Sequence, residues 1–164
     1  MWLWKIRKIE KMRKAKRILE KLKKIEKVRE SMELEVKDIM TPEVITISPD
    51  STLIEAAEQM LENRIHALVV TENDKPIGII TTYDLVLVIA LSDFDKLTKV
   101  RDVMVTKLIT VSPNEKVKDA IKKVIEKNIR RLIVVDGDKL VGIVSLIDLL
   151  LAYVTLPSSF TNQS

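Results

Sequence analysis

The chain has 164 residues, which is enough for one domain or for two very small ones. It has no cysteine and one histidine, His66, so disulfide frameworks, thiol nucleophiles, zinc-thiolate sites and multi-histidine metal sites are excluded. The net charge of +4 is unevenly distributed, because residues 1–33 carry +8 and the remaining residues carry −4. We therefore treat the first 33 residues and the body of the chain as two separate parts.

The sequence shows no targeting or membrane signal. No apolar run approaches the roughly 18 residues that a membrane span needs. The N-terminus lacks the apolar stretch and the small-residue cleavage site of a signal peptide. We therefore expect a cytoplasmic location.

Residues 1–33 are predicted to form one long, basic amphipathic helix. The segment lacks Gly and Pro, and its apolar residues recur at steps of three or four, which gives a narrow apolar seam. The seam favours packing on the body of the chain or on a second copy. The Lys and Arg residues, with Trp2 and Trp4 at one end, also suit contact of residues 2–33 with an anionic membrane surface or with nucleic acid.

The body of the chain is an internal repeat. When the sequence is shifted by 64 residues, residues 36–90 align with residues 100–154 without a gap, and roughly a third of the aligned positions are identical. A duplicated unit predicts two related clefts. The identical pairs include Asp38/Asp102, Met40/Met104, Thr46/Thr110, Pro49/Pro113, Ala56/Ala120, Leu68/Leu132, Gly78/Gly142 and Asp84/Asp148.

The first copy, residues 34–91, predicts a strand, a helix, two strands and a second helix. β-Branched runs favour the strands, and apolar residues at helical spacing favour the helices. The last helix is apolar almost all round, so we expect it to be buried between other elements. The predicted elements are a strand at 44–47, a helix at 53–63, strands at 67–71 and 77–81, and a helix from Tyr83 to about Leu91.

The second copy, residues 100–155, repeats this order. The fold class is therefore α+β, with two β-α-β-β-α repeats preceded by the long basic helix. Residues 92–99 are the expected connector and residues 156–164 the expected flexible tail. The predicted elements are strands at 108–111, 132–135 and 140–145, and helices at 117–127 and 147–153.

Each copy contains a hydroxyl residue three positions before an aspartate, at the junction between its last strand and its last helix. These pairs are Thr81 with Asp84, and Ser145 with Asp148. The spacing fits a helix capping box. It also fits ligand binding, because a helix start favours a phosphate and a carboxylate can accept hydrogen bonds from a ribose diol. The local sequence leaves both interpretations open.

A second candidate group lies at the start of a core strand in each copy. Arg130 and Arg131 in the second copy align with His66 and Ala67 in the first. One arginine could point outward and pair with a carboxylate. Alternatively, the two arginines could hold a phosphate, because the guanidinium fork matches phosphate oxygens. His66 is more often an ordinary, partly buried histidine in such a position.

The two copies resemble the CBS domain, which occurs in tandem pairs. The resemblance covers about residues 36–154, and its specificity lies in the ordered set of motifs. One departure is that the proline often found in the central strand is Val69 in the first copy and Ile133 in the second. The motifs that carry the resemblance are VKDIMTP at 36–42, TISP at 46–49 and GIITTYDL at 78–85, with VRDVM at 100–104, TVSP at 110–113 and GIVSLIDL at 142–149.

The resemblance implies a pseudo-twofold pair of repeats with an adenosine-containing ligand in the clefts between them. It places the aspartates on the ribose, the Thr or Ser on the phosphate side, and the basic residues on phosphates in the cleft whose aspartate comes from the other copy. Ile45 and Ile109 would be apolar walls for the base, and Tyr83 is a weak stacking candidate. The implied first site is Thr81, Asp84, Ile109, Thr110, Arg130 and Arg131, and the second is Thr41, Ile45, Thr46, His66, Ser145 and Asp148.

We therefore expect a non-catalytic sensor that binds AMP, ADP, ATP or an S-adenosylmethionine-like ligand and transmits its ligand state to a partner protein or to the N-terminal helix. The sequence contains no P-loop, Gly-rich dinucleotide loop, nucleophile elbow or metal-ligand cluster, so we expect no catalytic residue, metal or catalytic cofactor. The family resemblance also implies a homodimer. The alternative is a structural or interaction protein with degenerate clefts, whose basic helix binds a membrane surface or nucleic acid.

Overall fold

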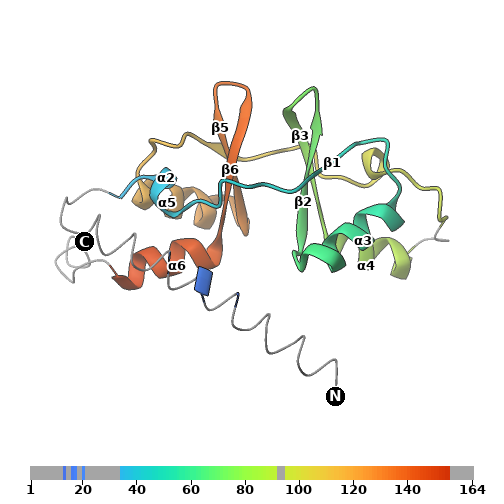
Figure 1. Ribbon diagram of the computed structural model, residues 1–164, viewed down its shortest axis with the longest axis horizontal. Coiled ribbons are helices and arrows are strands. Elements are labelled where there is room, and N and C mark those ends of the chain that lie inside the picture. The colour runs from blue at the N-terminus through green and yellow to red at the C-terminus, as the bar shows by residue number, and fades with distance from the viewer. Residues whose placement is uncertain (1–12, 14–15, 18–19, 21–33, 92–94, 156–164) are drawn as a thin grey trace, which may run out of the picture. The chain divides into compact units, whose positions relative to one another are not determined.

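The computed structural model describes residues 34–91 and 95–155, together with 13, 16, 17 and 20 (Figure 1). The predicted tail and most of the predicted N-terminal helix lie outside the described residues. The expected contacts of residues 2–33 with a membrane surface, nucleic acid or a second copy therefore stay predictions.

The order of elements confirms the α+β fold class and the two β-α-β-β-α repeats. The first copy contains α2 (Val36–Ile39), β1 (Thr46–Ile47), α3 (Leu53–Asn63), β2 (Ala67–Glu72), β3 (Lys75–Thr81) and α4 (Thr82–Leu91). The second contains the 3-10 helix η1 (Val100–Asp102), β4 (Thr110–Val111), α5 (Val117–Lys127), β5 (Arg131–Asp136), β6 (Lys139–Ser145) and α6 (Leu146–Thr155).

Each copy builds a three-stranded sheet with the same register. β1 pairs in parallel with β2, with Thr46 opposite Val69, and β2 pairs in an antiparallel manner with β3. In the second sheet, of order β4-β5-β6, Thr110 lies opposite Ile133. Both pairs of partners are related by the 64-residue offset. β1 and β4 have two residues each and are shorter than predicted, because two residues in each segment pair with the neighbouring strand.

The described residues divide into two compact units, and each unit contains parts of both copies. The first unit comprises residues 34–40, 114–131 and 144–155, and the second comprises residues 41–113 and 132–143, in each case with the gaps given above. A short leader segment at the start of each copy, residues 34–36 and residues 98–100, forms backbone hydrogen bonds with the other copy.

In the first unit, the leader of the first copy pairs with the helix start of the second copy. The Val36 amide donates to the Glu115 carbonyl at 2.8 Å, and the Val117 amide donates to the Leu34 carbonyl at 3.0 Å. Val36 and Ile39 of α2 are buried. Hydrogen bonds from Lys37 and Lys116 hold the pKa of the Glu35 carboxyl below its usual range.

In the second unit, the leader of the second copy pairs with the helix start of the first copy. The Leu53 amide donates to the Thr98 carbonyl at 3.0 Å, and the Val100 amide donates to the Ser51 carbonyl at 2.8 Å. These four positions are related by the 64-residue offset of the repeat to the four positions that pair in the first unit. The two copies therefore exchange leaders.

The core of the second unit lies between α3, α4 and the sheet β1-β2-β3. Figure 1 shows α3 and α4 next to each other beside this sheet. Val100, from the exchanged leader, packs into the same core. Burial of these aliphatic side chains is the main stabilising contribution in the unit. The buried members are Ile47, Leu53, Ala56, Met60, Leu68, Val70, Ile80, Leu85 and Val100.

The prediction that α4 is buried on all sides is wrong. Leu85 is its buried residue, whereas Val86 is 62% exposed and Leu91 is 76% exposed. The helix packs one stripe against α3 and β3 and leaves its other apolar side chains on the surface. Hydropathy indicates that a helix needs apolar partners, but it does not say whether those partners lie in the same chain. In the described ranges, no helix has both the length and the hydropathy that crossing a membrane requires.

Gly78 of β3 is a position where a side chain does not fit. A Cβ added there would lie 2.5 Å from the Met104 sulfur and 3.3 Å from the Val105 carbonyl oxygen. We predict that Gly78→Ala lowers the free energy of unfolding by about 1–3 kcal/mol through overpacking. Urea unfolding measures the change. The same substitution made in a Met104→Ala background should cost less, and an equal cost in both backgrounds would contradict the steric explanation.

Candidate functional site

Thr81 and Asp84 form a complete capping box at the start of α4. The Asp84 Oδ2 atom accepts hydrogen bonds from the Thr81 amide at 2.7 Å and from the Thr81 hydroxyl at 2.6 Å. The Asp84 amide in turn donates to the Thr81 Oγ1 atom at 3.3 Å. The capping interpretation of this pair is therefore correct. Asp84 is half-buried, and no described residue donates to its Oδ1 atom, so that oxygen is available to a ligand.

Ser145 and Asp148 form the same box at the start of α6. The Asp148 Oδ2 atom accepts from the Ser145 amide at 2.8 Å and from the Ser145 hydroxyl at 2.7 Å. Asp148 is 7% exposed, which makes it more buried than Asp84. The same local geometry therefore lies in two different environments, one half-open and one nearly closed.

The segment before β1 and the segment before β4 are each tied to the last strand of the other copy. Val105 and Ile79 of β3 exchange two backbone hydrogen bonds, of 2.9 and 3.0 Å. Thr41 and Ile143 of β6 exchange two more, of 2.9 and 3.0 Å. All four residues belong to the second unit. Thr81 lies two residues after Ile79, so the strand that carries the first capping box is joined to the segment that leads to Ile109 and Thr110.

Arg130 and Arg131 lie at the start of β5, as predicted. Arg130 is exposed and precedes the strand, and Arg131 is half-buried and is the first residue of β5. Burial lowers the pKa of the Arg131 guanidinium, and the adjacent charge of Arg130 lowers it further. Among the described residues, neither arginine forms an ion pair, whereas Arg101 pairs with Asp50. The outward-pointing ion pair that the sequence left open is thus not formed within the described ranges.

His66 occupies the position that corresponds to Arg130. It is exposed, and its carbonyl accepts a hydrogen bond from the Thr82 amide at 3.1 Å, as the Arg130 carbonyl does from the Leu146 amide. The expectation of a partly buried histidine is therefore wrong. His66 lies one residue before β2, whose first residue, Ala67, is buried.

The structure brings some of the predicted residues together and leaves other groupings as predictions. Each capping box is a direct contact, and the residues before β1 and β4 are tied to β6 and β3. The grouping of Arg130 and Arg131 with Asp84, and that of His66 and Thr41 with Asp148, joins residues of the two compact units and stays a prediction. Ile45, Thr46 and Thr41 are half-buried, as is Ile109, and Thr110 is exposed.

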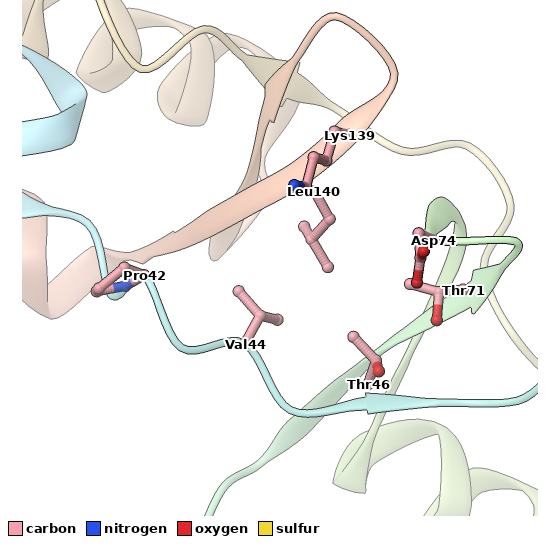
Figure 2. Close-up of a pocket in the computed structure, with 7 residues that line it drawn as sticks. All are labelled: Pro42, Val44, Thr46, Thr71, Asp74, Lys139 and Leu140. Atoms are coloured by element: carbon pink, nitrogen blue, oxygen red, sulfur yellow. The ribbon is translucent and has the colours of Figure 1, made fainter.

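The second unit also contains a pocket that the sequence did not indicate. Its volume is about 300 Å³. Figure 2 shows that side chains from the 42–46 segment, from the β2–β3 hairpin and from the start of β6 surround it. Thr46 is the one residue of the predicted sites that lines it. The lining residues are Pro42, Val44, Thr46, Thr71, Asp74, Lys139 and Leu140.

The described residues hold no group of three or more His, Cys, Asp or Glu side chains that could bind a metal ion. The candidate residues offer hydrogen bonding and charge. They include the carboxylates of Asp84 and Asp148 at helix starts and the guanidinium groups of Arg130 and Arg131, which form no ion pair with the described residues.

Comparison with known proteins identifies the family. A sequence profile of the CBS domain matches residues 36–91 and again residues 100–155. The chain belongs to the CBS domain family. It is 40% identical over 114 residues to the CBS domain-containing protein YhcV of Bacillus subtilis, and the match covers 70% of this chain and 81% of that protein. A longer relative from Methanopyrus kandleri is matched over 61% of its length.

Solved structures of CBS domain pairs have the same fold. The CBS domain pair of the protein MJ0100, in complex with 5'-methylthioadenosine and S-adenosyl-L-methionine, superposes with a TM-score of 0.68 at 28% identity and covers 74% of this chain and 96% of that one. A hexameric CBS-CP12 protein from bloom-forming cyanobacteria superposes with a TM-score of 0.66 at 32% identity, over 73% and 67% of the two chains. The two CBS domains therefore form a tandem pair, which is a regulatory module.

The capping box at the start of α4 should make a measurable contribution to the free energy of unfolding. We predict that Thr81→Ala lowers the free energy of unfolding by about 1 kcal/mol, because the Asp84 amide loses its acceptor. Thr81→Ser keeps the hydroxyl and should cost less. Chemical denaturation of the three proteins makes the comparison, and an equal loss for Ala and Ser would contradict the capping role.

Proposed function

We propose that the CBS pair binds an adenosine-containing ligand and changes its interactions in response. The observation that carries this proposal is the arginine pair at the start of β5, since neither Arg130 nor Arg131 forms an ion pair within the described part of the chain. A half-buried guanidinium next to a second positive charge is in an unfavourable environment until an anion neutralises it. Two adjacent guanidinium groups suit the oxygens of a phosphate chain.

The capping boxes supply the second part of the proposed recognition. Asp84 uses one carboxylate oxygen for the box and has the other one available. A carboxylate oxygen can accept a hydrogen bond from a ribose hydroxyl. Thr81 stands at the start of α4, where the helix dipole favours negative charge. Capping and ligand binding are therefore compatible at this residue.

The first proposed site is Thr81, Asp84, Ile109, Thr110, Arg130 and Arg131, and the second is Thr41, Ile45, Thr46, His66, Ser145 and Asp148. The two sites share the carboxylate and differ in positive charge, because His66 and Ala67 replace the two arginines. We propose that the first site takes a ligand with two or three phosphates at least as well as AMP. The second site suits a ligand with less negative charge.

The related MJ0100 pair supports the adenosine part of the proposal. Its two ligands, 5'-methylthioadenosine and S-adenosyl-L-methionine, share adenosine with ATP and AMP but carry no phosphate. The candidate ligands for this chain are therefore AMP, ADP, ATP and S-adenosylmethionine-like compounds. These candidates differ in charge. The arginine pair favours the candidates that carry phosphates.

A thermal-shift panel tests the proposed function. AMP, ADP, ATP, NAD and S-adenosylmethionine are added in turn to the full chain. A compound that binds the native state alone raises the melting temperature by mass action, by roughly 5–10 °C at a concentration about 100-fold above its Kd. We predict a rise with at least one of them that Asp84→Asn and Arg131→Ala abolish.

Two matched variants control for general effects of these substitutions. The Asp102 Oδ2 atom accepts a hydrogen bond from the Lys99 amide, so Asp102→Asn changes a comparable local contact outside the proposed site. Arg101→Ala removes an arginine that pairs with Asp50. Both controls should keep the ligand response. If no compound shifts the melting temperature at millimolar concentration, the interaction-protein alternative takes the place of the sensor.

We also propose that the chain associates as a homodimer through the exposed apolar side chains of α4. Tyr83, Val86, Ile89 and Leu91 are each more than half exposed on this ten-residue helix. Apolar surface of this extent on one helix is typical of an interaction site. The hexameric CBS-CP12 protein supports association of CBS pairs into larger assemblies.

The dimer proposal predicts a change in molar mass. Light scattering coupled to size-exclusion chromatography should give twice the mass of 18.8 kDa for the wild type. Val86→Glu should shift the equilibrium to the monomer, because it buries a charge in the interface. Leu97→Glu changes a residue of similar exposure, 72%, outside the helices, and should leave the mass unchanged. A monomeric wild type would refute the proposal.

A further inference from the structure

The pocket beside the 42–46 segment is a candidate for a further ligand site. Its volume of about 300 Å³ lies at the lower end of the range for small-molecule sites. Figure 2 shows Val44 and Leu140 on facing sides of the pocket, with Thr71 and Asp74 together on the hairpin side. Apart from Thr46, its lining residues do not belong to the proposed adenosine sites.

The charges around this pocket are related by the internal repeat. Asp74 and Lys75 in the β2–β3 turn correspond to Asp138 and Lys139 in the β5–β6 turn. A symmetric pair of turns would form two ion pairs. The structure forms one of them, in which Lys75 Nζ lies 2.6 Å from Asp138 Oδ2. The hydrogen bond and charge of Lys75 hold the pKa of the Asp138 carboxyl below its usual range.

The other half of this symmetric arrangement is open. Among the described residues, Asp74 and Lys139 form no ion pair or hydrogen bond through their side chains, and both line the pocket. The pocket thus presents one exposed carboxylate and one exposed ammonium group that form no ion pair with each other. The pocket is also lined by the apolar residues Val44, Leu140 and Pro42 and by Thr46 and Thr71, which carry hydroxyl groups.

We infer that this pocket binds a small zwitterion of amino-acid size with an aliphatic side chain. The ammonium group of the ligand pairs with Asp74, and its acidic group pairs with Lys139. The aliphatic part packs against Val44 and Leu140, and the threonine hydroxyls can donate to or accept from its polar groups. A ligand with a single charge would pair with either Asp74 or Lys139. A ligand that carries both charges can pair with both residues, so we expect it to bind more tightly.

This inference goes beyond the proposed adenosine function, and its test has a different readout. The ¹⁵N-labelled full chain is titrated with L-leucine up to about 10 mM, because contacts with exposed charges give weak binding. The expected result is a saturable shift of the amide signals of Val44, Thr46 and Leu140. The single-charge analogues 4-methylpentanoate and 3-methylbutylamine should each bind about fivefold more weakly.

Variants at the open pair and at its closed counterpart separate this role from general effects. Asp74→Asn and Lys139→Gln should each weaken L-leucine binding about fivefold. Asp138→Asn breaks the neighbouring ion pair in the same pair of turns and should leave the affinity about the same. No saturable shift with L-leucine would overturn the inference, as would wild-type affinity in both charge variants. A shift of these three amides by 5'-methylthioadenosine and not by L-leucine would also overturn it, and would assign the pocket to the adenosine ligand.

Discussion

The exchange of leader segments is the constraint on which the rest of this CBS pair depends. Residues 34–36 complete the helix start of the second copy, and residues 98–100 complete that of the first. Each leader then continues to a residue, Thr41 or Val105, that is bridged to the last strand of the other copy. Backbone groups in these segments would otherwise be left without partners, which is costly in a buried position. A single copy would leave these backbone groups of its leader and helix start without the partners that they have in this chain.

The same exchange decides which residues can cooperate in ligand binding. Because β3 is bridged to the segment before β4, the first capping box is connected to Ile109 and Thr110 from the other copy. Within the box, one aspartate oxygen accepts hydrogen bonds from both the amide and the hydroxyl of the threonine. A carboxylate held in this way loses little conformational entropy when a ligand binds. The capping contact therefore holds Asp84 in the position that its proposed role in ligand binding requires.

Much of the fold could be predicted from the sequence because its signals are local. The helices at 53–63 and 117–127 have the predicted bounds, since their apolar spacing and helix-start residues act within a few turns. Both capping boxes follow from a spacing of three.

Leader exchange could not be predicted, because backbone hydrogen bonds between distant segments leave no mark on residue type. The pocket was missed for a related reason: Asp74 and Lys139 look like ordinary turn residues until the two hairpins meet. The exposed side chains of α4 show that hydropathy indicates that a helix needs apolar partners, but it does not indicate whether those partners belong to the same chain.

The two copies have diverged in charge at positions that the proposed function places in the ligand sites. Several residues on which the fold depends are the same in both copies, including Gly78 with Gly142 and Asp84 with Asp148. The residues that set the charge differ, because His66 and Ala67 stand where the second copy has Arg130 and Arg131. In the hairpins the Asp-Lys pair is the same, Asp74 with Lys75 and Asp138 with Lys139, but Lys75 and Asp138 form an ion pair and the described residues Asp74 and Lys139 do not. On the proposed function, substitution at these few positions changes ligand preference while both copies keep the same fold. On the proposed function, adenosine recognition is thus common to both sites, and the charge of the ligand determines which site it occupies.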